Sequence, residues 1–282
     1  MNKVKSICRI ISAMLPLAIF FGGGCANTSE DYSWTENRTI VHALGVANGE
    51  SYTNSLEALN NSLAQGQTVF EVDLALTSDG ELICAHDSVT LMGEDNRAFL
   101  EGKELCDITK DEFTSLKIRD KYTTLCMEDL ILVMKDHPDM YIVTDTKEDR
   151  QEGIKKQFDN IVELAKKNKC SKVLDRIIPQ IYNEDMFSTL QKIYPWKSYI
   201  YTSYYTQDED WDEDKFIDFA YDKGVKVLAV FAGRGTDSLL ETANSLGLKV
   251  YVHTYNTEEE RQAFFERGFW GLYTDTLPPI EK

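Results

Sequence analysis

The chain has 282 residues, 43% of them hydrophobic, and a formal net charge of −17 at neutral pH. This apolar content suffices for a substantial core, which excludes a globally disordered protein. The strong negative charge excludes a basic footprint for nucleic acid, so we expect no nucleic acid partner.

The first 24 residues have the layout of an export signal. Three basic residues precede an apolar run, residues 10–21, which is short for a membrane span. Small residues then lead to Cys25, an arrangement similar to the lipobox of bacterial lipoproteins. We expect a lipoprotein-type signal peptide over residues 1–24, with an ordinary cleaved signal or an uncleaved anchor as alternatives. Its removal would change the charge from −17 to −20, so a lipid on Cys25, not charge, would hold the protein at the cell envelope membrane.

Residues 25–38 are polar and predict a tether, with the folded domain over residues 39–282. Four cysteines fall in that domain without the paired spacing of zinc sites. Export would permit disulfides, but the spacing pairs none of them, and we expect core thiols at Cys84, Cys106, Cys126 and Cys170.

From residue 39 onward, strand-like and helix-like segments alternate. Each strand-like segment but the last is followed by a helical one, as in repeated βα units. Such units form a doubly wound sheet or a closed barrel. Eight units over about 240 residues favour the barrel, and the missing glycine-rich loop after the first strand weakens the dinucleotide-binding alternative. We therefore predict the α/β class and a single-domain (β/α)8 TIM barrel. The expected strands are 39–44, 69–76, 140–146, 176–182, 199–204, 225–232, 249–256 and 270–275, and the expected helices are 54–65, 124–134, 152–167, 184–193, 213–223, 238–246 and 258–267.

An insertion interrupts the alternation after the second strand. Ser78-Asp79-Gly80 predicts a turn into a further strand, 81–85. Residues 88–120 then show no clear period and predict short helices. Because this segment follows His86 directly, we expect it to cover the site and to shape specificity.

Acidic residues are placed at the ends of two predicted strands. Glu71 and Asp73 are two residues apart in an apolar strand, so they point to one face, where their burial requires a positive partner. Asp145 ends the third strand, and a barrel directs all strand ends to one rim. Three converging carboxylates suit one divalent cation, Ca²⁺ or Mg²⁺. The alternative is that the acid pair is a solvated face.

Two histidines flank these acids, His42 at the end of the first strand and His86 after the second. Beside a metal they suit general acid and general base catalysis. Lys147 could neutralise a phosphoryl oxygen. Taken singly, each histidine could also be a hydrogen-bonded structural residue.

These motifs resemble the glycerophosphodiester phosphodiesterase family over about residues 39–276. The most specific block of that family is Glu-x-Asp, Asp-Gly and His-Asp. The matching stretches are Glu71-x-Asp73, Asp79-Gly80, His86-Asp87, Asp145-x-Lys147 for the family's Glu-x-Lys, and Gly271 to Asp275 for its late Gly-x-x-Thr-Asp.

The resemblance implies a (β/α)8 barrel and a metal-dependent phosphoric diester hydrolase. Glu71, Asp73 and Asp145 would hold one divalent metal, and His42 and His86 would be the acid–base pair. In that family a neighbouring hydroxyl attacks phosphorus, and water then opens the cyclic product. The implied substrate-binding residues are Lys147, at the phosphate or a metal-ligand carboxylate, and Gln180, lining the cavity, to which we add Asn256 of the seventh strand.

Two residues depart from the family pattern near the first strand. The family's His-Arg-Gly is His42-Ala43-Leu44 here, and its Glu-Asn-Thr is Thr53-Asn54-Ser55. Losing the arginine and the glutamate together leaves no orphaned buried charge. We infer that recognition of the phosphate or head group is rebuilt, so a glycerophosphodiester or a related lipid, polyol or wall-polymer phosphodiester is expected as substrate.

Two other functions stay open. A non-catalytic envelope protein could bind phosphorylated ligands on the same barrel, as the loss of the arginine suggests. A barrel glycosidase would use paired carboxylates without a metal, but two acids on one strand are poorly placed to flank a sugar ring.

Overall fold

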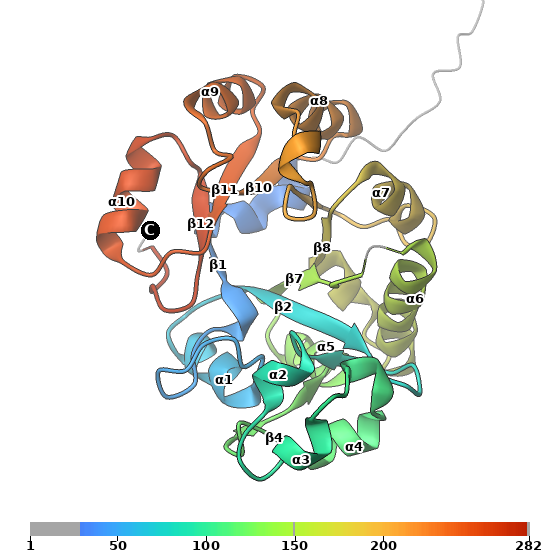
Figure 1. The fold of residues 1–282 in the computed structure, drawn as a ribbon. Helices are drawn as coiled ribbons and strands as arrows, with labels where there is room; N and C mark the ends of the chain where they lie inside the picture. Colours follow the sequence, from blue (N-terminus) through green and yellow to red (C-terminus); the bar gives the residue numbers. More distant parts are fainter. Residues whose placement is uncertain (1–28, 149, 281–282) are drawn as a thin grey trace, which may run out of the picture.

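Eight parallel strands close into a barrel in the protein, whose computed structural model describes residues 29–148 and 150–280. Each strand pairs with the next along the sheet, and the first pairs with both the second and the last. Figure 1 shows the ring of helices around them, which confirms the predicted (β/α)8 barrel. The barrel strands are β1 (Thr39–Val41), β2 (Val69–Leu76), β7 (Tyr141–Asp145), β8 (Ile177–Ile181), β9 (Ile200–Thr202), β10 (Val227–Phe231), β11 (Lys249–His253) and β12 (Gly271–Thr274).

A helix follows every barrel strand but the last, as the alternation predicted. The outward-facing residues of β2, among them Phe70 and Val72, belong to the apolar layer between barrel and helices. The surrounding helices are α1 (Leu56–Ala64), α5 (Met127–Asp136), α6 (Gln151–Lys167), α7 (Glu184–Leu190), α8 (Glu213–Lys223), α9 (Asp237–Ser245) and α10 (Glu258–Glu266), with short 3-10 turns η4 (Ser171–Arg176) and η5 (Asp208–Asp210) between them.

The first strand is shorter than predicted. It ends at Val41, and His42–Leu44 forms a 3-10 turn, η2, in which Ala43 has φ 47°. The turn brings the Ala43 backbone N–H to Glu71 Oε2 at 2.7 Å. The chain therefore leaves the barrel wall at His42 and bends over the site.

Two predicted helices start later than expected. The side chain of Ser55 accepts a hydrogen bond from the Ala58 N–H and caps α1, so the helix does not include Asn54. The helix expected at residues 124–134 begins at Met127, because the preceding residues form the short strands β5 (Tyr122–Thr123) and β6 (Leu125–Cys126).

The barrel interior follows the two-residue period of its strands. Its lower part is filled by apolar side chains, among them Ile40, Val69, Val143 and Tyr251. Two residues further along each strand, the same inward face carries a polar side chain. Those residues are His42, Glu71, Asp145 and His253.

The segment predicted as a tether is folded where the structure describes it. Residues 29–37 form a 3-10 segment, η1, in which Tyr32 and Trp34 are buried against the apolar barrel interior. The Trp34 indole N–H donates to Ser198 Oγ at 3.1 Å. The tether prediction was wrong for this part, because two aromatic residues in a polar stretch close the lower end of the barrel.

The insertion packs beside the barrel rather than inside it. Strand β3 (Leu82–Cys84) runs antiparallel to β2 and to β6, which extends β2 beyond the barrel as a hairpin. The predicted short helices follow, and Figure 1 shows them gathered next to this hairpin. They are α2 (Ser88–Leu91), α3 (Arg97–Leu100), η3 (Leu105–Asp107) and α4 (Lys110–Ser115), followed by a small sheet of β4 (Lys117–Ile118) and β5.

The four cysteines of the domain are free thiols. Cys84, Cys126 and Cys170 are buried as expected, whereas Cys106 is exposed, so the core-thiol prediction was wrong there. Within residues 29–148 and 150–280, no helix is long and apolar enough to cross a membrane. The predicted signal peptide and Cys25 lie outside the described residues.

Candidate active site

Three buried carboxylates meet where the barrel strands end. Glu71 and Asp73 lie on β2 and Asp145 ends β7, and one oxygen from each lies within 4.8 Å of the others. Strands β2 and β7 are neighbours, with Asp73 opposite Asp145 in register. The sheet therefore brings the three predicted metal ligands into one cluster.

Two side chains to which the sequence assigned no role hold these acids in place. Asn54 Nδ2 donates to Asp73 Oδ2 at 2.8 Å, and Asn54 Oδ1 accepts from the Asp73 N–H at 3.1 Å. The Tyr182 hydroxyl donates to Asp145 and accepts from the Thr146 N–H at 3.0 Å. Asn54 lies in a recognised motif and Tyr182 ends a predicted strand, but spacing alone does not show which carboxylate each one reaches.

Lys147 brings positive charge into this cluster. Its Nζ lies 2.9 Å from Asp73 Oδ1 and also pairs with Asp145. Burial lowers the pKa of Lys147, but the charges of Asp145, Asp73 and Glu71 outweigh burial and raise it, so the ammonium stays charged. Lys147 supplies one positive charge, whereas the three carboxyl groups would carry three negative charges if all were ionised.

The cluster fits a hard divalent cation. Burial, and after it the charge of Asp73, raises the pKa of Glu71 to about 8, so this carboxyl group needs a nearby positive charge to ionise at neutral pH. Asp73 Oδ1 is buried, and among the residues that the structure describes its one close partner is the Lys147 ammonium. Carboxylate oxygens are the ligands that Ca²⁺ and Mg²⁺ prefer.

His42 is held by a carboxylate from the other end of the sequence. Its Nδ1 lies 2.8 Å from Asp275 Oδ1, and Asn256 Nδ2 donates to Asp275 Oδ2 at 2.8 Å. Burial raises the pKa of Asp275, but the hydrogen bond from His42 outweighs burial and lowers it, so the carboxylate is ionised. An ionised carboxylate only accepts, so His42 Nδ1 carries a proton and Nε2 is left for chemistry.

His86 repeats this arrangement at a more exposed position. Its Nδ1 lies 2.7 Å from Asp87 Oδ2, and its side chain is 34% exposed. Burial raises the pKa of Asp87, but hydrogen bonds from the Thr90 N–H and His86 outweigh it and lower the pKa. Asp87 also caps α2 through Thr90, which fixes the carboxylate and therefore the ring.

An aromatic wall links the two histidines. The Tyr52 ring stands edge-on to His42 and to His86, with centroid distances of 4.4 and 5.8 Å. His253 packs on the other side of His42, at 4.9 Å. Burial, then the charges of His42 and Lys147, lowers the pKa of His253 well below its usual value, so this imidazole is neutral. The sequence assigned no role to Tyr52, which lies in a loop between predicted elements.

The remaining predicted substrate-binding residues lie at the rim in different settings. Gln180 is buried in the barrel, and its Oε1 accepts from the Tyr273 hydroxyl at 2.8 Å. Asn256 is exposed, and its side chain is bonded to Asp275 and to Thr274 Oγ1. In the described protein Asn256 therefore orients the partner of His42, and its contact with substrate stays a prediction.

The two residues that depart from the family pattern are both buried. Ala43 is fully buried in η2, and Thr53 is 1% exposed, with its hydroxyl 2.9 Å from Ser55 Oγ. Neither brings a charge. This agrees with the inference that arginine and glutamate are lost together without leaving a buried ion unpaired.

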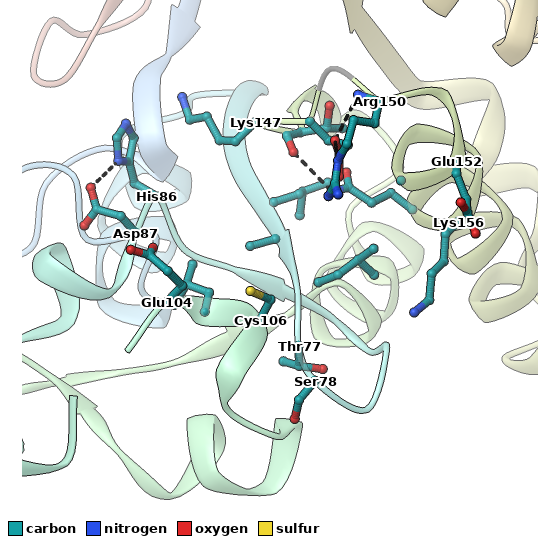
Figure 2. Close-up of a pocket in the computed structure, with 18 residues that line it drawn as sticks. Thr77, Ser78, His86, Asp87, Glu104, Cys106, Lys147, Arg150, Glu152 and Lys156 are labelled. Carbon is teal, nitrogen blue, oxygen red and sulfur yellow. Dashed lines mark hydrogen bonds and ion pairs between the residues drawn. The ribbon is translucent and has the colours of Figure 1, made fainter. Parts of the chain in front are cut away.

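A cavity of about 710 Å³ opens beside the site (Figure 2). In Figure 2, His86 and Cys106 from the insertion lie on one side of the strand that crosses the view, and Lys156 from α6 lies on the other. The insertion therefore walls this cavity through η3. The insertion was predicted to cover the site, and the lining residues show that it borders the cavity beside the site.

Comparison with known proteins gives one family and one fold. The model of the glycerophosphoryl diester phosphodiesterase family matches residues 47–277. An uncharacterised protein of Bacillus subtilis, YqiK, is 22% identical over 245 residues, which cover 84% of this chain and 95% of that protein.

Solved structures share the barrel. A crystal structure described as a putative glycerophosphoryl diester phosphodiesterase from Silicibacter pomeroyi has a TM-score of 0.71 at 19% identity, covering 86% of this chain and 90% of that one. A phosphodiesterase from Oleispira antarctica, solved with the product sn-glycerol-3-phosphate, has a TM-score of 0.67 at 16% identity, covering 84% and 92%.

The family match spans most of the chain and includes the acid cluster and His86, whereas His42 lies just before its first residue. The chain therefore belongs to the glycerophosphoryl diester phosphodiesterase family and is a glycerophosphodiester phosphodiesterase-like enzyme.

Proposed function

We propose that the protein is a metal-dependent hydrolase of a glycerophosphodiester or a related lipid or polyol phosphodiester. The observation that carries this proposal is the pairing of each histidine, His42 and His86, with its own carboxylate beside the three-acid cluster. The bound sn-glycerol-3-phosphate in the Oleispira antarctica relative supports a product of that kind.

The cation would be Ca²⁺ or Mg²⁺, held by Glu71, Asp73 and Asp145. When bound, it would neutralise negative charge on the phosphoryl oxygens. Lys147 would add a second positive charge from the same side, since its ammonium already lies among these acids.

The two histidines can move the protons that the reaction requires. His42 Nε2 takes a proton from a substrate hydroxyl beside the phosphate, and that oxygen bonds to phosphorus while the bond to the leaving alcohol breaks. His86 gives a proton to the leaving oxygen. In the second half, the roles reverse: water attacks the cyclic phosphate, gives its proton to His86, and the ring oxygen receives one from His42.

The test is hydrolysis of a phosphodiester panel in Ca²⁺, in Mg²⁺ and in chelator. We expect activity to disappear in chelator and to return with one of the two cations. His42→Ala and His86→Ala should each lower kcat by several orders of magnitude, on the scale of about 10²–10⁴-fold or more for lost acid–base catalysis.

The matched control is His137→Ala, which changes an exposed histidine at the end of α5. It should leave activity unchanged. Full activity of both site-histidine variants would rule out the proposed function.

A second candidate is a non-catalytic envelope protein that binds phosphorylated ligands. The buried, uncharged Ala43 and Thr53 favour it, because the family's arginine is gone. Binding of a phosphodiester with no turnover across the whole substrate and metal panel would support this alternative.

We further propose that the protein is exported and anchored by a lipid on Cys25. The basic, apolar and small-residue order of residues 1–25 supports this. Mass spectrometry of the mature N-terminus should find a diacylated Cys25, and Cys25→Ala should release the protein from the membrane fraction. An unmodified mature N-terminus would contradict anchoring.

A further inference from the structure

The cavity beside the site is bordered by His86, the histidine that would protonate the leaving group. We call it the head-group groove and define it by its floor on β2 (Leu74, Leu76), its walls on η3 (Cys106) and α6 (Gln157), and the site residues His86 and Lys147. Figure 2 shows His86 and Lys147 on one side of β2's extension, with Cys106 further along the groove. A substrate whose phosphate lies at Lys147 and His86 would extend its alcohol into this space.

The groove is large for a small alcohol. Its volume of about 710 Å³ falls within the range of roughly 300–1,000 Å³ of pockets that take drug-sized ligands. A leaving group of two or three carbons would leave most of it filled with water. The extended β2–β3 hairpin and the insertion create this space, and both lie outside the barrel itself.

The charges of the groove do not favour a second phosphate. Lys147 is paired with Asp73 and Asp145, and Arg150 with Glu148. Of the groove's other charged residues, Asp87 is paired with His86, and Glu104, Glu152 and Lys156 together add no positive excess. An alcohol that carries a negative charge would therefore meet no surplus of positive charge.

Two buried polar groups on the groove side lack partners within residues 29–148 and 150–280. There, Thr146 Oγ1 and Gln157 Oε1 make no hydrogen bond, although both residues are at least 97% buried and line the groove. Gln157 is fixed by its amide nitrogen, which donates to the Thr146 carbonyl at 3.1 Å. Buried polar groups normally find partners, so a small rotation toward a bound hydroxyl would satisfy them.

We propose that the head-group groove binds the leaving alcohol and that this alcohol is a hydroxyl-rich group of polyol or sugar size without an anionic group. The apolar floor of Leu74 and Leu76 contacts its carbon face, while Thr146 and Gln157 bind its hydroxyls. The proposal rests on the proposed phosphodiester hydrolysis and specifies its substrate class. It also assigns proton donation to His86, the histidine that borders the groove.

The first test compares two substrates that differ only in the leaving alcohol, glycerophosphoinositol and glycerophosphoethanol. Cys106→Trp places a bulky ring in the groove. It should lower kcat/KM for glycerophosphoinositol about tenfold or more and change glycerophosphoethanol less than twofold, as expected for steric discrimination in a pocket. The matched control is Val89→Trp, at an exposed position of α2 that does not line the groove.

Equal losses for both substrates in Cys106→Trp, or no loss for either, would overturn the groove assignment. Wild-type protein that hydrolyses no phosphodiester in the panel would instead refute the proposed function. The two failures are therefore distinguishable.

The second test does not depend on turnover. Cys106 is an exposed thiol of the groove, whereas Cys84, Cys126 and Cys170 are buried, so peptide mapping can follow its alkylation by iodoacetamide. In His42→Ala protein, glycerophosphoinositol should slow alkylation of Cys106, and glycerophosphoethanol at the same concentration should not. Equal protection by both ligands, or protection by neither, would contradict the proposal.

Discussion

His42 Nδ1 lies 2.8 Å from Asp275 Oδ1, so the first and the last barrel strands share one acid–base unit. Thr39–Val41 pairs in parallel with Leu272–Thr274, and the two strands end together. The unit therefore exists only when the barrel is closed. The catalytic role proposed for His42 would accordingly depend on the pairing of two segments more than 200 residues apart in sequence.

Asp275→Asn should reduce activity and move its pH dependence. Burial lowers the pKa of His42, but the hydrogen bond to Asp275 and the charge of Glu71 outweigh burial and raise it above 6.5. A general base must be neutral, so wild-type kcat/KM should fall below this raised pKa. In Asp275→Asn the charge of the aspartate is gone, so burial lowers the pKa of His42 and the acidic limb of the profile moves to lower pH. The kcat should also fall about 10²-fold or more, because the tautomer of His42 is no longer fixed.

The measurement is a pH–rate profile of both proteins. Asn256→Ala is the milder comparison, because it removes one hydrogen bond to Asp275 and keeps the charge. An acidic limb that stays in place in Asp275→Asn would show that another group controls it.

Glu71→Gln should stabilise the protein in chelator and abolish its response to cation. The pKa of Glu71 is raised by burial and by Asp73 from its ordinary value of 4.5 to about 8. The folded state holds this proton more tightly than the unfolded state, so the carboxylate lowers stability progressively as pH rises from about 4.5 to 8. A neutral amide removes that penalty and can still accept from the Ala43 N–H.

Chemical denaturation at pH 8, with chelator and with Ca²⁺ or Mg²⁺, checks this prediction. Wild-type protein should gain stability from the cation, and Glu71→Gln should gain little. A variant that is less stable than wild type in chelator at pH 8 would contradict the electrostatic argument.

The aromatic ring of Tyr52, and not its hydroxyl, should support the activity of the enzyme. The ring packs edge-on against His42 and His86, and edge-to-face pairs contribute about 0.5–1.5 kcal/mol beyond burial. Tyr52→Ala should therefore lower kcat about tenfold by loosening both imidazoles, whereas Tyr52→Phe should retain most activity. Equal kcat losses in the two variants would instead point to a role for the hydroxyl.

Trp34→Ala should destabilise the barrel without touching the site. Trp34 is 4% exposed, closes the lower end of the barrel and donates to Ser198 Oγ. Removing a buried tryptophan typically costs about 3–5 kcal/mol. Urea denaturation should show this loss, and kcat at low temperature should remain that of the wild type. The outcome that contradicts this packing role is a change in unfolding free energy of less than about 1 kcal/mol.

Much of the fold could be predicted from patterns within single segments. Alternating apolar strands and amphipathic helices predicted the eight strands and the helices between them. Element ends were harder to place. Ser55, an N-cap, sets where α1 begins, and Ala43, in a left-handed turn, sets where β1 ends. Both depend on contacts that a local pattern does not contain.

The sequence by itself determined the inward-facing chemistry, because strand residues two apart share a face. That period predicted Glu71 with Asp73, and the barrel hypothesis directed Asp145, His42 and Lys147 toward the same rim. Only the tertiary structure decided the partners: Asn54 for Asp73, Tyr182 for Asp145, Asp275 for His42 and Tyr52 between the histidines. The physical reason is that these partners come from distant segments, so closure of the sheet and packing of the loops select them.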